Sequence, residues 1–222
     1  MDRIEPTAVF IPLNGHTIQG DLTFSPDSKA AVIFAHGSGS SRLSSRNRHV
    51  AEVLNQTGLA TLLIDLLTSE EEGIDNETSQ YRFDIDLLTD RLVIATDWLH
   101  KHPALSTLPI GYFGASTGAA AALAAAARRP NVIDAIVSRG GRPDLAGDAL
   151  KKVIAPTLFI VGEFDQQVLD LNRQAASAMQ TPPVIELIPA ATHLFEEPGA
   201  LNQVADLARD WFERVLIRRQ AA

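Results

Sequence analysis

The sequence of 222 residues contains no cysteine. Disulfides, thiolate ligands for zinc or iron–sulfur clusters, and a cysteine nucleophile are therefore all excluded. Basic residues are not in excess either, because 19 Lys and Arg stand against 27 Asp and Glu and give a formal net charge of −8. Nucleic acids and anionic membranes favour basic surfaces, so we expect neither of them as a partner.

Long hydrophobic runs are also missing. The longest run, residues 119–127, has about half of the roughly 20 residues that a membrane-spanning helix needs. Residues 1–6 show neither the apolar core nor the small-residue cleavage site of a secretory signal. A content of 45% apolar and 21% charged residues is typical of a globular chain. We therefore expect a cytoplasmic globular protein.

Short apolar runs alternate with longer segments of helical periodicity along the chain. The short runs, which we predict to be strands, cover residues 7–11, 17–24, 30–35, 60–65, 110–113, 132–138, 157–161 and 184–188. The helical patterns cover residues 46–57, 85–99, 116–128 and 201–215. Such an alternation is typical of a parallel sheet built from βαβ units.

The first two predicted strands are separated by Asn14 and Gly15, a turn signal that predicts an antiparallel hairpin. No repeat and no Pro/Gly/Ser-rich linker divides the rest of the chain, so we expect one α/β domain over residues 1–222. Residues 69–86 interrupt the alternation, because they are acidic and have little periodicity. They are either a solvated connection or part of a small lid at about residues 66–84, since loops of this length are often functional.

Residues 114–118 read Gly-Ala-Ser-Thr-Gly and lie between a predicted strand and a predicted helix. A serine at the tip of such a tight turn needs small residues two positions before and after it, and its Oγ then projects from the carboxyl edge of the sheet. We therefore predict that Ser116 is a nucleophile. The alternative is an ordinary strand-to-helix turn in which Ser116 only caps the helix.

A nucleophilic serine needs a base, and that base needs an acid that orients it. His193 is the only histidine that follows Ser116 in the chain, and it comes just after the predicted strand 184–188. Asp165 comes just after the predicted strand 157–161. Ligands bind at the carboxyl ends of the strands in open α/β sheets, so these three side chains are predicted to meet at one edge.

The loop after the predicted strand 30–35 reads His-Gly-Ser-Gly-Ser-Ser at residues 36–41. A glycine-rich loop at this place can direct a backbone N–H group toward Ser116. With the N–H group of Thr117 it would supply two donors for the oxyanion of a tetrahedral intermediate, and one such donor is typically worth about 10²–10³ in rate. We predict that His36 holds this loop and takes no part in the reaction.

Four motifs together resemble those of the α/β-hydrolase superfamily, and more narrowly those of the dienelactone-hydrolase-like serine hydrolases, some of which are fused to phosphoribosyltransferase domains. The motifs are residues 36–42, 114–118, 162–165 and 191–193, so the resemblance covers nearly the whole chain. It implies a mostly parallel eight-stranded sheet with helices on both faces and a minimal lid. True dienelactone hydrolases use a cysteine nucleophile, which this chain lacks, so their particular substrate is not carried over.

By this resemblance, Ser116 is the nucleophile, His193 the general base and Asp165 the acid that orients it, while Ser38 and Thr117 donate to the oxyanion. The predicted function is that of a carboxylesterase-like serine hydrolase, which acts on small or short-acyl esters without a cofactor or a metal. A thioesterase, a lactonase or an acyltransferase could use the same three side chains, and a non-catalytic ligand-binding protein of this fold would need none of them. The sequence leaves open whether the chain is a monomer or a homodimer.

Two other functions are less well supported. Residues 37–42 imitate part of a dinucleotide-binding fingerprint, but Arg42 stands where the third glycine would allow close packing of the helix. His100 and His102 are two positions apart, and the sequence has no His-Glu-x-x-His motif, so a metal site is not favoured.

Arginines follow two of the predicted strands at the edge that would hold the site. Arg42, Arg139 and Arg142 are candidates for substrate binding, with Arg46 close by in the sequence. Guanidinium groups can bind a carboxylate or a phosphate with two parallel hydrogen bonds. The alternative is that these arginines pair with the acidic residues at 70–77 or with the ends of helices.

Overall fold

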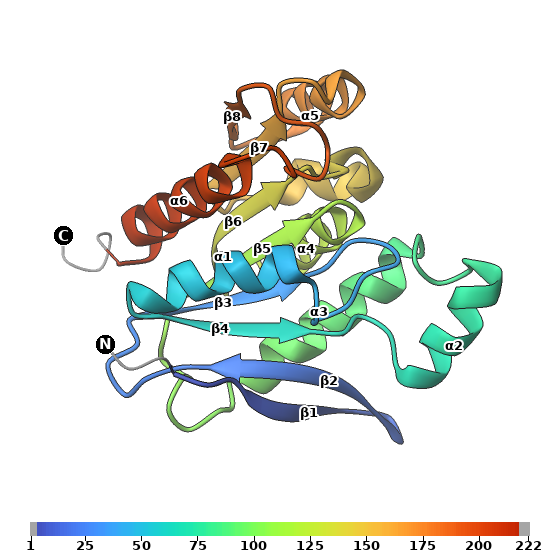
Figure 1. Cartoon of the computed structure of the whole chain (residues 1–222). Coiled ribbons are helices and arrows are strands. Elements are labelled where there is room, and N and C mark those ends of the chain that lie inside the picture. Colours follow the sequence, from blue (N-terminus) through green and yellow to red (C-terminus); the bar gives the residue numbers. More distant parts are fainter. Residues whose placement is uncertain (1–3, 218–222) are drawn as a thin grey trace.

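The computed structural model describes residues 4–217, and in this part of the chain eight strands form one mostly parallel sheet with helices on both faces (Figure 1). The strands are β1 (Thr7–Leu13), β2 (His16–Thr23), β3 (Ala30–Ala35), β4 (Leu59–Ile64), β5 (Ile110–Ala115), β6 (Ile133–Arg139), β7 (Thr157–Gly162) and β8 (Val184–Ile188). Their order across the sheet is β1-β2-β4-β3-β5-β6-β7-β8. The predicted fold class is confirmed.

Strands β1 and β2 form the predicted antiparallel hairpin. Their register runs from Thr7 opposite Leu22 to Leu13 opposite His16. The turn between them places Asn14 at φ +34° and Gly15 at φ +91°, and these are the two residue types that tolerate positive φ best. Strand β2 is also antiparallel to β4, whereas the pairings from β4 through β8 are parallel.

The helices lie in two layers (Figure 1). One face of the sheet carries α1 (Ser45–Gln56) and α6 (Ala200–Phe212), and the other carries α3 (Ile85–Leu99), α4 (Thr117–Arg128) and α5 (Gln166–Ala178). Two short 3₁₀-helical segments, separated by a kink at Gly147, cover Pro143–Lys152, and a short π-helical segment covers Glu213–Ile217. Because both faces are covered, every residue of β3, β4, β5 and β7 is buried, which explains the unbroken apolar runs in the sequence.

Helix α4 lies at the centre of its layer, and its residues from Thr117 to Ala126 are all buried. Nearly all of them are alanine or glycine, so the helix can lie close to the sheet and to its neighbours. Its first residue directly follows Ser116. The dense packing of α4 therefore fixes the position of the predicted nucleophile.

The sequence patterns did not predict helices α5 and α2 (Ser69–Thr78). Residues 69–78 were expected to form part of a connection or a lid, but they form a helix that extends beyond the edge of the sheet (Figure 1). A capping box starts it, because Glu71 N donates to Thr68 Oγ1 at 3.2 Å and Thr68 N donates to Glu71 Oε2 at 2.8 Å. Among the helices of residues 4–217, none has the length and apolar character needed to cross a membrane.

Candidate active site

Ser116 sits on a strained turn between β5 and α4. Its backbone angles are φ +51° and ψ −121°, in a region that costs free energy for any residue with a Cβ. A Cβ at Gly114 would collide with the backbone of Ala119, and a Cβ at Gly118 would collide with the carbonyl oxygen of Ala35. The two glycines of the motif are therefore required by close approach, as the sequence predicts.

Asp165 and His193 form a short hydrogen bond at the ends of β7 and β8. Nδ1 of His193 lies 2.6 Å from Oδ2 of Asp165. Asp165 starts helix α5 without capping it through its side chain, so the carboxylate is available to the imidazole. A proton on Nδ1 donates to this carboxylate, which leaves Nε2 as the acceptor nitrogen.

The loop that carries His193 is anchored through two residues that precede it. Ala190 N donates to Glu163 Oε2 at 2.8 Å. Thr192 donates to Glu197 Oε1 from its backbone N at 3.0 Å and from its hydroxyl at 2.6 Å. These contacts restrict the backbone next to His193, so the imidazole does not depend on Asp165 alone for its position.

Ser116 and His193 both contact the loop after β6. Ser116 N donates to the carbonyl oxygen of Arg139 at 3.3 Å, and Arg142 N donates to the carbonyl oxygen of Ser116 at 3.1 Å. A Cβ on Gly140 would lie 3.6 Å from Cε1 of His193. The structure thus brings the three residues predicted from the sequence, Ser116, Asp165 and His193, to one edge of the sheet.

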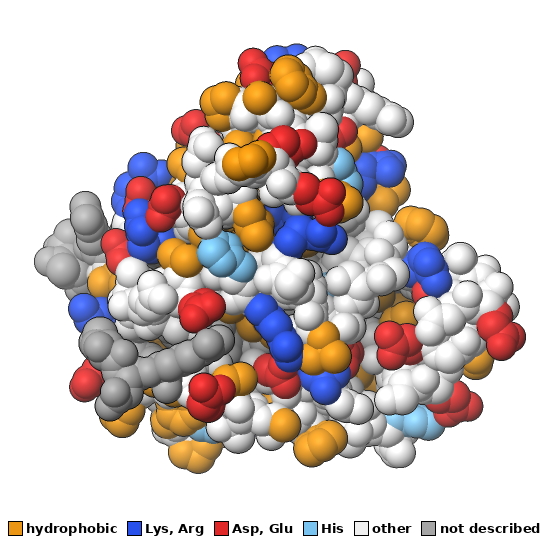
Figure 2. All heavy atoms as spheres, viewed as in Figure 1, with side chains coloured by type: hydrophobic (Ala, Val, Ile, Leu, Met, Phe, Trp, Pro, Cys, Tyr) orange, Lys and Arg blue, Asp and Glu red, His pale blue; other side chains and the backbone are white. Residues whose placement is uncertain are grey.

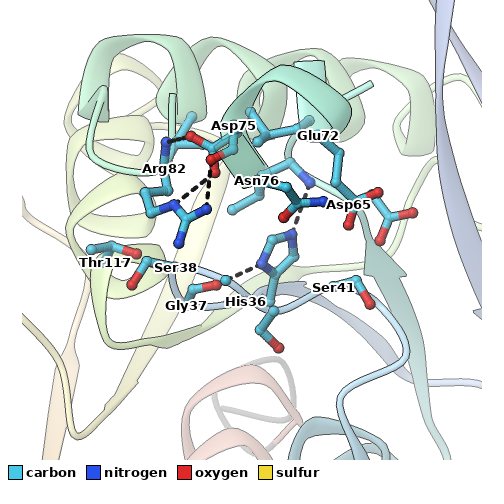
Figure 3. Close-up of a pocket in the computed structure, with 15 residues that line it drawn as sticks. His36, Gly37, Ser38, Ser41, Asp65, Glu72, Asp75, Asn76, Arg82 and Thr117 are labelled. Carbon is cyan, nitrogen blue, oxygen red and sulfur yellow. Dashed lines mark hydrogen bonds and ion pairs between the residues drawn. The ribbon is translucent and has the colours of Figure 1, made fainter. Parts of the chain in front are cut away.

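A small cavity of about 50 Å³ opens beside Ser38 and Thr117 (Figure 3). Its wall on one side is the glycine-rich loop at residues 37–41, and Gly37 packs against Ser116, because a Cβ on Gly37 would lie 3.0 Å from that of Ser116. The Thr117 hydroxyl is buried and has no hydrogen-bond partner among the described residues. Thr117 therefore offers a hydroxyl as well as the predicted backbone N–H group.

His36 joins the glycine-rich loop to the chain that follows β4. Its Nδ1 donates to the carbonyl oxygen of Gly37 at 2.9 Å, and its Nε2 accepts from Leu66 N at 3.0 Å. The predicted loop-holding role is confirmed by these contacts. Burial lowers the pKa of His36, against smaller opposing contributions from Gly37 and nearby carboxylates.

This pKa shift predicts a loss of stability in mild acid. The folded protein binds a proton at His36 less readily than the unfolded chain, whose histidines titrate near about 6.5. The stability contributed by neutral His36 is therefore complete above that pH and is lost as the pH falls toward the lower pKa of the folded state. His36→Gln, which keeps an acceptor for Leu66, should melt at a less pH-dependent temperature between pH 7.5 and 5.5.

The control for this prediction is His16→Gln, which replaces an exposed histidine in the β1–β2 hairpin. This variant should keep the pH dependence of the wild-type melting temperature. If His36→Gln lost stability on acidification as steeply as the wild type, another group would be responsible.

The three arginines proposed for substrate binding have different surroundings. Arg42 Nη1 pairs with Asp65 at 2.6 Å, and its Nε lies 3.3 Å from Asp21. Arg142 pairs with Asp144 through two hydrogen bonds, of 2.9 and 2.8 Å. Their acidic partners lie outside residues 70–77, so pairing with that segment is wrong for both. The third, Arg139, is buried and makes no ion pair with a described residue.

Sequence reasoning missed a fourth arginine, Arg82, which lines the cavity. Figure 3 shows its guanidinium beside Ser38 and Thr117. Nε donates to Asp75 Oδ2 and Nη2 donates to the Asp75 carbonyl oxygen, both at 2.7 Å. Nη1 makes no hydrogen bond to a described residue, and a Cβ on Gly39 would lie 3.6 Å from it.

Asp75 is the buried anchor of Arg82. It is 3% exposed and accepts hydrogen bonds from the backbone N–H groups of Tyr81 and Arg82, at 2.7 and 2.9 Å. Burial raises the pKa of Asp75, but the hydrogen bonds from Arg82 and Tyr81 outweigh it and hold the pKa below its usual value. Nothing in the sequence marks this pairing, because the two partners are seven residues apart and only the helix end at Ser79 brings them together.

The chain is similar to known proteins in both sequence and structure. The model of the dienelactone hydrolase family matches residues 19–217. A dienelactone hydrolase from Anabaena variabilis, whose crystal structure is known, is 55% identical in sequence. The two structures superpose with a TM-score of 0.94, and the match covers 97% of this chain and 100% of that one. Est1E from Butyrivibrio proteoclasticus has a TM-score of 0.77 at 17% identity, covering 93% of this chain and 98% of its own, and supports the fold alone.

Curated relatives are longer than this chain. Proteins from two strains of Mycobacterium tuberculosis, provisionally named phosphoribosyl transferases, are 54% identical over 211 residues. The match covers 95% of this chain and 46% of those proteins. The chain thus spans about half the length of these relatives.

Proposed function

Because the chain belongs to the dienelactone hydrolase family, we propose that this α/β-hydrolase cleaves small or short-acyl carboxylic esters through an acyl-enzyme on Ser116. One observation carries the proposal: the 2.6 Å bond from His193 to Asp165 leaves Nε2 as an acceptor at the sheet edge where Ser116 lies on its strained turn. Proteins that only bind a ligand have no need for a serine, a histidine and an aspartate in this relation.

In the proposed reaction, His193 Nε2 accepts the proton of Ser116 while Oγ attacks the ester carbonyl carbon. The backbone N–H groups of Ser38 and Thr117 stabilise the oxyanion that forms. His193 then donates the proton to the departing alcohol, and the acyl group stays on Ser116. A water molecule then attacks the acyl carbon while it gives a proton to His193. The bond from that carbon to Ser116 Oγ breaks, His193 returns the proton to Oγ, and the acid leaves.

Residues 66–84 act as a small lid in this proposal. They supply one wall of the cavity, including Asn76 on α2 and Arg82 beyond it, opposite the glycine-rich loop (Figure 3). The Nη1 group of Arg82, next to Ser38, would donate a hydrogen bond to an oxygen of the substrate. The Asp75 contacts hold that guanidinium before substrate arrives, which reduces the entropy lost on binding.

The cavity volume of about 50 Å³ suits a short acyl group. We expect kcat/KM for p-nitrophenyl esters to be highest for acetate or propionate and to fall at least about 10-fold by octanoate, because each extra methylene must displace packed side chains. A screen over p-nitrophenyl esters of rising chain length measures this. No hydrolysis of any of these esters by folded protein would contradict the proposed function.

Leu88 and Leu92 provide a matched pair of variants for the acyl-binding cavity. Both are buried leucines on α3, but only Leu88 lines the cavity. Each change to alanine should destabilise the fold by about 2–5 kcal/mol, whereas only Leu88→Ala should shift the preferred acyl length upward. Equal profiles for the two variants would place the acyl group elsewhere.

A thioesterase or a lactonase would use the same chemistry on a different bond. Rates for phenyl acetate and its thioester, S-phenyl thioacetate, separate the first case, and a δ-lactone separates the second. The phosphoribosyl transferase name of the longer relatives describes proteins of which this chain matches about half. We therefore propose a small-molecule ester, and not a phosphoribosyl donor, as the substrate.

A further inference from the structure

Arg139, at the end of β6, is a buried cation without a carboxylate partner among the described residues. It is 7% exposed, and the one hydrogen bond that its guanidinium makes to a described residue runs from Nη2 to Asn47 Oδ1 at 3.3 Å. Its guanidinium carbon lies 5.8 Å from the centre of the Phe195 ring, and its buried Nε has no partner in the described chain. A buried charge in such surroundings is costly unless a counter-charge approaches it.

Arg46 adds a second guanidinium at the same place. Burial and the charge of Arg46 together lower the pKa of Arg139 to about 10. The Nη1 group of Arg46 lies 3.3 Å from Glu196, whose side chain is 67% exposed. The Nε of Arg46 is buried and has no hydrogen-bond partner in residues 4–217. Among the described residues, the only carboxylate paired with either guanidinium is the exposed Glu196 beside Arg46, so the local charge stays positive.

The start of helix α1 adds to this positive potential. Ser44 caps the helix, and Arg46 and Asn47 belong to its first turn. The first turn of a helix carries a partial positive charge and favours anions. Arg46, Asn47 and Arg139 thus bring donors and positive potential together from α1 and from the end of β6.

This cluster adjoins the proposed reaction site. The carbonyl oxygen of Arg139 accepts the hydrogen bond from Ser116 N, and the next residue, Gly140, packs against His193. Phe195, which lies over the Arg139 guanidinium, is two residues beyond His193. An anion held here would lie close to an ester bound at Ser116.

We propose that Arg46 and Arg139 form an anion-binding subsite for a carboxylate or phosphate group, at the start of α1 and next to the reaction site. The anion accepts hydrogen bonds from the unpartnered guanidinium N–H groups and offsets the buried charge of Arg139. Arg42 and Arg142 are not part of it, because each forms a short ion pair with a carboxylate that is mostly buried. The partner of Arg46, Glu196, is farther away and 67% exposed. The anion is either an acidic group of the ester substrate or a free anion. The first of these two sources rests on the proposed function.

Binding of inorganic phosphate tests the subsite without any reaction. Isothermal titration calorimetry of the full chain should show phosphate binding that weakens at least about 10-fold in Arg139→Met and in Arg46→Met, since each loses a charge-assisted hydrogen bond. The control is Arg48→Met, because Arg48 lies on the same helix, is about half exposed and pairs with Asp21. It should bind as the wild type does. Arg46 is more exposed than Arg139, so Arg46→Met decides the test if Arg139→Met does not fold.

Two pairs of esters then identify the source of the anion. Phenyl acetate and 4-carboxyphenyl acetate differ by an acid on the alcohol, and phenyl pentanoate and monophenyl adipate differ by an acid on the acyl group. If the substrate supplies the anion, Arg46→Met lowers kcat/KM for one acidic ester at least about 10-fold more than for its neutral partner. If the anion is a free ion, the arginine substitutions weaken phosphate binding but leave the kcat/KM ratio of acidic to neutral ester unchanged.

The subsite is wrong if phosphate binding and both ester ratios are the same in the wild type, Arg46→Met and Arg139→Met. Failure of the proposed function has a different signature. In that case no ester is cleaved by any form of the protein, while phosphate binding still depends on Arg46 and Arg139.

Discussion

Replacing Ser116 by alanine is expected to lower kcat for p-nitrophenyl acetate by at least about 10⁴-fold, to a rate close to that of the uncatalysed reaction. Removal of the nucleophile leaves only binding and the oxyanion donors, which retain a small part of the acceleration in other serine hydrolases. Steady-state kinetics, with correction for background hydrolysis, measures the loss.

The Ser116→Ala protein should stay folded. The Ser116 side chain makes no capping hydrogen bond to α4, and alanine suffers no more strain at this positive φ than serine does. Its melting temperature should therefore stay close to that of the wild type. Ser177→Ala, a change at an exposed serine on α5, is the control and should keep full activity. Activity retained in Ser116→Ala would mean that another group attacks the ester.

Asp165→Asn is expected to lower kcat by about 10³–10⁴-fold with little change in structure. An asparagine amide can donate to Nδ1 of His193, which moves the imidazole proton to Nε2 and removes the acceptor that Ser116 needs. The corresponding change in trypsin lowers kcat by about 10⁴ for this reason. Steady-state kinetics on p-nitrophenyl acetate, together with circular dichroism, separates this loss from unfolding.

Asp170→Asn is the matched control for Asp165→Asn. Asp170 lies on the same helix, is largely exposed and, within residues 4–217, forms an ion pair only with Arg173, at 3.4 Å. Its change to asparagine should leave kcat within about twofold, as is usual for surface positions. If Asp165→Asn were equally active, the 2.6 Å contact would serve the fold and not the reaction.

Local sequence signals predicted the framework of the fold well. The Asn14–Gly15 turn, the apolar strands and the Gly-x-Ser-x-Gly motif each depend on neighbouring residues, and each appears in the structure as expected. The chain order of Ser116, Asp165 and His193 was sufficient to place them, because parallel strands bring their carboxyl ends to one edge of the sheet.

The sequence patterns that indicate helices α2 and α5 are weaker than those of the other helices. Thr68 and Glu71 have the spacing of a capping box, yet the residues after them are acidic and lack an apolar face. In α5, the buried residues Val168, Leu169, Asn172 and Ala175 have helical spacing, but a polar asparagine interrupts the apolar pattern. That asparagine is buried because it donates to the carbonyl oxygens of Gly141 and Val168.

The partners of the arginines could not be predicted, because they depend on contacts between segments far apart in the sequence. Arg42 reaches Asp65 and Asp21 only because β4 lies between β2 and β3 in the sheet. The isolation of Arg139 depends on Phe195 and α1 closing over it. Long side chains can reach many partners, and the assembled fold selects among them.

Covalent labelling tests the central claim most directly. The folded chain is treated with an alkyl fluorophosphonate, and the intact mass and the modified peptide are then measured. We predict that one phosphonyl group is added per chain, on Ser116, that labelling is much slower in His193→Gln, and that Ser116→Ala is not labelled. A folded wild-type protein that takes up no label, or takes it up at another residue, would contradict the account.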